Sequence, residues 1–171
     1  MRKTTWVLVM FAAFAGFAYS QVKEAKMLFD FEDAGDAAKW ESANAETSVV
    51  ADHATSNKSA LKVTLKAAEY PGISTAQIAN DWSGYSKLVF DVFADEDFNL
   101  AIRIDDENSK DYASRFNLDK NDVVKGKNTV TIDLVDIGDK IDLKKVKLLI
   151  LFSIGTQHDT TCYLDNVRLE K

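Results

Sequence analysis

Residues 161–171 read TCYLDNVRLEK, and this stretch decides how the rest of the chain is interpreted. Apolar and polar residues alternate along it, as in a β-strand with one buried face. Tyr163, Val167 and Leu169 fall on the apolar face. Asp165 falls on the same face, where an ionised carboxylate is costly unless it is paired or binds a metal ion. The stretch predicts a final strand with one exceptional acidic residue.

A second acidic strand is predicted near the other end of the sequence. Residues 27–33 read MLFDFED, so Asp30 and Glu32 would share one face of a strand. A first and a last strand that both carry carboxylates suggest that the two ends of the folded chain lie side by side. The segments between them then form the rest of the sheets.

The first 20 residues have the pattern of a secretory signal peptide. Two basic residues precede an apolar run at 6–17, and small residues follow at 18–20. The run has about 12 residues, whereas a membrane-spanning helix needs about 20. Residue 21 is Gln rather than Cys, which argues against a lipoprotein. We expect residues 1–20 to direct export to the periplasm, the cell surface or the extracellular space.

Residues 21–171 are expected to form one domain with no membrane span, long enough to bury a substantial core. The sequence has 27 acidic and 21 basic residues, and its net charge is −6. This charge disfavours nucleic acid and anionic lipid as partners, because both are bound through Lys and Arg. Cys162 is the single cysteine, which excludes an internal disulfide. We expect it to be a small buried hydrophobic residue.

Short segments with alternating hydrophobicity recur at turn-rich intervals, which is typical of an all-β sandwich. The segment at 145–154 is apolar on both faces and predicts a central strand. Helix is limited to single turns at 37–40 and 135–140. The fold class is therefore a single antiparallel β-sandwich, with further strands expected at 47–51, 60–66, 74–79, 87–94, 99–106, 112–118 and 128–135.

The terminal carboxylates Asp30, Glu32 and Asp165 form the first candidate site. Calcium takes about six to eight oxygen ligands, and often mixes carboxylates with backbone carbonyls. The loop at 57–59 precedes a predicted strand and could supply such carbonyls. The alternative is a set of exposed acidic residues at strand ends.

The second candidate site combines two neighbouring predicted strands. Arg103 and Asp105 would share one face of the first strand, and Arg115 and Asn117 one face of the second. Planar bidentate groups of this kind bind sugar hydroxyls, and an aromatic ring can pack against the C–H face of the sugar. The rings available are Tyr70, Trp82, Tyr85 and Tyr112, of which Tyr112 and Trp82 are the expected stacking residues. The alternative is an Arg–Asp ladder on a solvated sheet face.

Catalytic motifs are missing from the sequence. His53 and His158 lie in polar segments without partners at metal-ligand spacing. We find no serine elbow, no Cys–His arrangement and no phosphate-binding glycine loop. An enzyme is therefore not expected.

Short segments along the chain form a pattern when they are taken in order. They are LFDFED at 28–33 with Trp40, ALKV at 60–63, YPG at 70–72, DWSGY at 81–85 and YLDNVRL at 163–169. Together they resemble jelly-roll carbohydrate-binding modules of the galactose-binding-like group. The resemblance implies a jelly roll of eight or nine strands with a structural calcium ion near the termini. It places Glu32 and Asp165 among the calcium ligands, and it supports Asp30 as a ligand less directly.

The leading functional hypothesis is a secreted, non-catalytic protein that binds a polysaccharide or oligosaccharide. Its sugar-binding residues would be Arg103, Asp105, Tyr112, Arg115, Asn117 and Trp82. The main alternative is an exported envelope or extracellular structural protein with the same fold, whose sheet faces contact other envelope proteins. A small polysaccharide-cleaving enzyme is a third hypothesis, because jelly rolls can host such sites.

Overall fold

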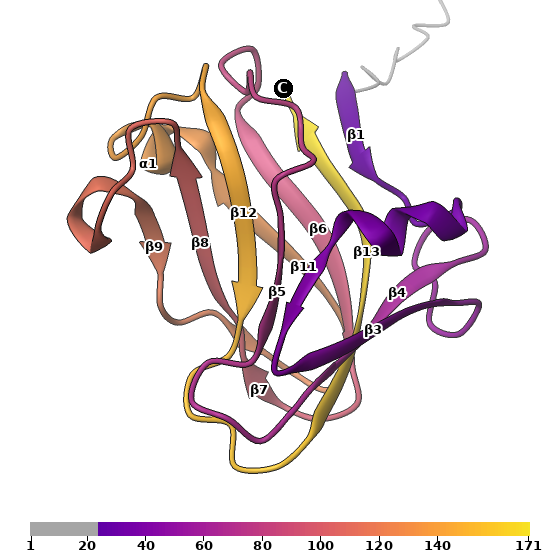
Figure 1. Ribbon diagram of the computed structural model, residues 1–171. Coiled ribbons are helices and arrows are strands. Elements are labelled where there is room, and N and C mark those ends of the chain that lie inside the picture. Colours follow the sequence, from indigo (N-terminus) through magenta and orange to yellow (C-terminus); the bar gives the residue numbers. More distant parts are fainter. Residues whose placement is uncertain (1–23) are drawn as a thin grey trace, which may run out of the picture.

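The computed structural model describes residues 24–171, which fold into two antiparallel β-sheets packed face to face (Figure 1). The larger sheet has the strand order β11-β6-β13-β4-β3, with β1 also paired to β13. Its strands are β1 (Ala25–Phe29), β3 (Ala45–Val50), β4 (Ala60–Leu65), β6 (Lys87–Ala94), β11 (Gly126–Asp133) and β13 (Thr160–Glu170).

The smaller sheet has the strand order β2-β5-β12-β8-β9. It contains β2 (Glu41–Ala43), β5 (Gly72–Thr75), β8 (Ala101–Asp106), β9 (Phe116–Leu118) and β12 (Val146–Phe152). A short pair, β7 (Phe98–Asn99) and β10 (Asp122–Val123), lies outside both sheets. The helical turns are η1 (Ala34–Lys39), η2 (Tyr112–Ser114) and α1 (Leu134–Gly138). The predicted all-β antiparallel sandwich is confirmed, and the strands exceed eight or nine because several have only two or three residues.

Strand β13 is the centre of the larger sheet, as its alternation predicts. It pairs with β6 along its length, with β4 through its first half and with β1 through its second half. The backbone N–H of Lys171 also donates to the carbonyl of Glu24 at 3.2 Å. The two ends of the described chain therefore lie side by side, as predicted (Figure 1).

A bulge at Asn166 changes which face of β13 its residues occupy. Asn166 has a φ of 56°, and the register with β6 shifts by one residue between Asp165 and Arg168. Leu164 and Val167 consequently both face the core. Asp165 faces the outer side of the larger sheet, so the prediction that it shares a face with Val167 is wrong.

The first strand, β1, ends earlier in the sequence than predicted. It stops at Phe29, and the buried Phe31 has a φ of 55°, a left-handed conformation that regular strand pairing does not use outside bulges. Asp30 and Glu32 therefore lie in the loop that follows β1 rather than on one face of a strand.

The core lies between the sheets and is formed by the alternating apolar residues of both. Leu88, Phe90 and Val92 of β6 are buried, and Leu149 and Leu151 of β12 face them from the smaller sheet. Full burial of each such side chain stabilises the fold by about 1.5–3 kcal/mol.

Cys162 is buried in this core, and burial raises the pKa of its thiol to about 12. The thiol is therefore neutral at ordinary pH, as expected for a small hydrophobic residue. Within residues 24–171, no helix has the length and apolar character needed to cross a bilayer. The predicted signal peptide lies outside the described residues.

Candidate functional site

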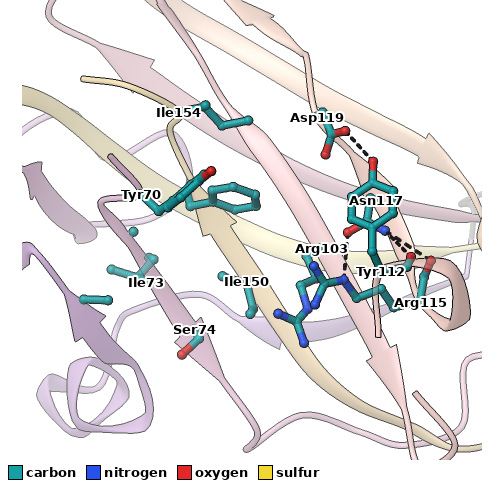
Figure 2. A pocket seen from close by; sticks show the side chains of 13 residues that line it. Tyr70, Ile73, Ser74, Arg103, Tyr112, Arg115, Asn117, Asp119, Ile150 and Ile154 are labelled. Carbon is teal, nitrogen blue, oxygen red and sulfur yellow. Dashed lines mark hydrogen bonds between the residues drawn. The ribbon is translucent and has the colours of Figure 1, made fainter. Parts of the chain in front are cut away.

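A groove of about 530 Å³ lies on the outer face of the smaller sheet (Figure 2). Strand pairing forms its floor: Arg103 of β8 lies opposite Asn117 of β9 on one side and Ile150 of β12 on the other. Ile150 in turn lies opposite Ser74 of β5. Because these residues share one face of adjacent strands, their side chains line the same groove.

One end of the groove is apolar. Tyr70 is 55% exposed, and its ring lies 6.5 Å from that of Phe152 at an interplanar angle of 57°. Ile150 and Ile154 also line this part of the groove. Such a surface suits the C–H faces of a sugar ring.

The other end is polar and internally hydrogen-bonded. Arg103 donates from Nε and Nη2 to the two carboxylate oxygens of Asp105, at 2.8 and 2.6 Å. This hydrogen-bonded ion pair raises the pKa of Arg103. Arg115 Nε donates to Asn117 Oδ1 at 3.0 Å, and the Tyr112 hydroxyl donates to Asp119 at 2.5 Å. That last bond raises the pKa of Tyr112.

Four of the six predicted sugar-binding residues line this groove: Arg103, Tyr112, Arg115 and Asn117 (Figure 2). Tyr112 belongs to the helical turn η2 rather than to the predicted strand at 112–118, whose second half alone forms β9. The turn leaves Tyr112 59% exposed.

The other two predicted residues lie elsewhere. Asp105 is buried and does not line the groove, but its bidentate ion pair orients the guanidinium of Arg103. Trp82 is fully buried in the core, and its Nε1 donates to the carbonyl of Ala79 at 2.6 Å. The predicted stacking role of Trp82 is therefore wrong, because no face of its ring reaches the surface.

The apolar floor was not among the predicted site residues. Ile150 and Phe152 alternate with the buried Leu149 and Leu151, so the segment is apolar on both faces. That signal predicted a strand covered on both sides, whereas the structure leaves one side open as the groove. Ligand pockets are lined mainly by hydrophobic and aromatic side chains, so this apolar floor is compatible with a binding site.

The terminal carboxylates, which form the first candidate site of the sequence, lie on the side of the larger sheet. The side chain of Asp165 has no exposed surface and accepts the backbone N–H groups of Thr55, Ser56 and Asn166, each at 2.7 Å. Glu32 accepts the N–H groups of Lys58 and Ser59 at 2.9 Å each. These carboxylates hold the loop between β3 and β4 against the sheet.

Asp91 joins the same network from β6, opposite Asp165. Burial raises the pKa of Asp91, but hydrogen bonds from Thr129, Thr55 and Asn166 outweigh it and hold this pKa below its ordinary value. The hydroxyl of Thr55 lies 2.9 Å from Asp91 Oδ2 and 3.0 Å from Asp165 Oδ2. It has one proton, so it donates to one of these carboxylates at a time.

The three carboxylates predicted to bind calcium do not form a shared cluster. Within residues 24–171, no group of three or more acidic, His or Cys side chains is placed to hold a metal ion. Glu32 and Asp165 face N–H donors, whereas calcium requires several oxygen ligands. Asp30 accepts only the N–H of Glu32, at 3.2 Å. The residues thus do not fit the predicted ligand set, and calcium binding itself stays a prediction.

Comparison with solved structures identifies the fold. The two-sheet sandwich is that of jelly-roll carbohydrate-binding modules, as the sequence resemblance predicted. The family 11 module of Clostridium thermocellum, in complex with a β-1,3-1,4-mixed-linked tetrasaccharide, matches with a TM-score of 0.68 and 18% identity. The match covers 88% of this chain and 96% of that module. A family 30 module of a cellulosomal cellulase of the same organism matches with a TM-score of 0.65 and 14% identity, over 85% of this chain and 96% of the module.

Larger proteins contain the same fold as one part. An exo-β-agarase matches with a TM-score of 0.68 and 19% identity, over 84% of this chain but 25% of the agarase chain. This chain therefore spans about a quarter of the length of that agarase. No protein-family model matches the sequence, and a search of curated proteins found no match. At these identities the similarities establish the fold alone.

Proposed function

We propose that this protein is exported and binds a glycan chain in the groove of its smaller sheet, without catalysing a reaction. The observation that carries the proposal is the groove itself, which has an exposed aromatic and aliphatic end and a fixed polar end. Its volume of about 530 Å³ lies within the range of ligand sites, about 300–1,000 Å³.

The two ends of the groove supply the two kinds of contact that sugar recognition uses. Tyr70 and Phe152 offer apolar surface to the C–H faces of the sugar rings. Arg103 and Asn117 lie opposite each other in the sheet and offer hydrogen bonds to sugar hydroxyls. Asp105 already fixes the side chain of Arg103, and the backbone carbonyl of Tyr112 fixes that of Asn117. Little side-chain freedom is therefore lost when a sugar binds.

The structural comparisons support the proposal at the level of the fold. The family 11 module is a carbohydrate-binding module in complex with a tetrasaccharide, and the exo-β-agarase contains the fold as one part. Residues 1–20, with their signal-peptide pattern, support export. The acidic surface is compatible with a neutral or weakly charged ligand.

A screen of the mature protein against gels that contain different soluble polysaccharides tests the proposal. The panel should include a mixed-linked β-glucan, a xylan and a galactan, each in neutral form and with anionic substituents. We expect retardation by at least one of them. Retardation by none, together with ordered oligomers in light scattering, would instead favour the structural envelope protein.

The variant Tyr70→Ala tests the role of the apolar end of the groove in glycan binding. We expect it to weaken glycan binding by roughly fivefold, because a lost aromatic contact costs about 1 kcal/mol. Its melting temperature should stay unchanged, since the ring is half exposed. Val124→Ala, which removes an equally exposed apolar side chain away from the groove, is the control. Equal affinity of both variants would place the binding site elsewhere.

A further inference from the structure

Arg115 is held in the groove by its Nε, and its two terminal nitrogens, Nη1 and Nη2, make no hydrogen bond within the described residues. Its Nε donates to Asn117 Oδ1 at 3.0 Å, and its ζ carbon lies 5.5 Å from the centre of the Tyr112 ring. Asn117 is fixed in turn, because its amide donates to the carbonyl of Tyr112 at 3.0 Å. Among residues 24–171, no hydrogen bond acceptor and no carboxylate engages Nη1 or Nη2 of Arg115.

Arg103 in the same groove has a different arrangement. Two of its nitrogens bind the buried carboxylate of Asp105 in a bidentate ion pair, so its charge is compensated within the protein. Arg115 lacks such a partner among the described residues. The acidic side chain that lines the groove, Asp119, accepts the Tyr112 hydroxyl instead. Neither Asp119 nor the nearby Asp111 forms an ion pair with Arg115, so Nη1 and Nη2 have no direct anionic partner at the polar end.

A neutral ligand that covers Arg115 would desolvate this charge without compensating it, which costs free energy. A carboxylate or a sulfate would compensate it through two parallel N–H···O bonds to Nη1 and Nη2, the strong form of such contacts. The surroundings limit how many anionic groups the ligand can carry. The protein has a net charge of −6, so a densely charged polymer is repelled before it reaches the groove.

We infer that Arg115 selects an anionic substituent, a carboxylate or a sulfate ester, carried at intervals by an otherwise neutral polysaccharide. The inference rests on the proposed function and specifies its ligand class. The neutral sugar rings occupy the apolar end of the groove beside Tyr70 and Ile150, and the anionic group lies at the Arg115 end (Figure 2).

Matched pairs of polysaccharides test the inference by affinity electrophoresis. One pair is a polysaccharide with occasional uronic acid groups and its carboxyl-reduced form. The other is a sparsely sulfated galactan and its desulfated form. We expect the wild-type protein to bind the charged member of one pair about tenfold more tightly, which corresponds to about 1.4 kcal/mol. The pair that shows this difference identifies the preferred group as a carboxylate or a sulfate.

Two variants assign the preference to Arg115. Arg115→Gln should bind both members of the pair equally, at the affinity of the wild-type protein for the neutral member. Lys62→Gln removes the same charge from β4 of the larger sheet, which does not line the groove, and should keep the preference. Equal folding is checked by the melting temperature.

The outcomes separate this inference from the proposed function. Equal retention of both members by the wild-type protein would overturn the role of Arg115 and leave glycan binding intact. Retention of no polysaccharide in either pair or in the neutral panel would overturn both. A preference that survives in Arg115→Gln would overturn the assignment to this residue.

Discussion

Asp165 shows how a single carboxylate can organise a large part of the surface. Its two oxygens accept three backbone N–H groups and the hydroxyls of the covering loop, although the side chain has no exposure to water. A buried carboxylate without a cation is stable when several donors surround it. The residue therefore fixes the loop between β3 and β4 to the centre of the larger sheet.

Replacement of this residue should uncouple the loop from the sheet. In Asp165→Asn the new NH₂ group would face either the N–H groups of Thr55 and Ser56 or that of Asn166, and either orientation leaves a buried donor unpaired. We expect the free energy of unfolding to fall by at least about 2 kcal/mol, measured by urea denaturation. Asp139→Asn, at an exposed position after α1, should change it by less than about 0.5 kcal/mol. A similar value for both variants would mean that the network does not stabilise the fold.

At the scale of elements, Gly72 determines how β5 approaches β12. Gly72 lies opposite Phe152, and a Cβ at this position would lie 2.5 Å from the Cβ of Phe152 and 2.6 Å from the carbonyl of Leu151. The absence of a side chain thus lets the two strands pair beside the apolar end of the groove. This close approach positions Phe152 in the groove floor.

Gly72→Ala should therefore affect stability and binding together. The added methyl group must displace β5 or Phe152, at a cost of about 1–3 kcal/mol in the free energy of unfolding. Glycan affinity should fall as the floor shifts, which affinity electrophoresis measures. Gly84→Ala is the matched control, because its Cβ would meet no atom within 4 Å. An unchanged free energy of unfolding in Gly72→Ala would contradict the prediction, because it would mean that β5 can move away from β12 at no cost.

These elements also show what the sequence could predict. The strand at 87–94 was predicted with its correct bounds, because Leu88, Phe90 and Val92 alternate with a clear period of two. The bulge at Asn166 is not predicted, because continuing the alternation from Tyr163 to Val167 ignores the one-residue shift that places Leu164 and Val167 on the same face. Trp82 was assigned to the site because the sequence shows which rings are present but not which are buried.

For the whole molecule, the two candidate sites lie on opposite outer faces of the sandwich. The groove is on the smaller sheet, whereas the carboxylate network fastens its loop to the larger one. The stacking of His53 on Phe93, with ring centres 3.8 Å apart, adds to the contacts of that loop with the larger sheet. Because the core separates the two faces, changes in the carboxylate network should alter stability and leave ligand binding in the groove unchanged.

The calcium prediction is best tested on the intact mature protein. Glu32 and Asp165 are already bound by N–H donors, so a calcium ion would have to compete with the hydrogen bonds that fix the loop. We expect the melting temperature of the mature protein in millimolar EGTA and in millimolar CaCl₂ to differ by less than about 3 °C, equivalent to roughly 1 kcal/mol. A larger rise with calcium that disappears in Glu32→Gln would establish an ion site that reorganises this loop. Glycan affinity, measured in the same two buffers, should be equal, because the groove lies on the other sheet.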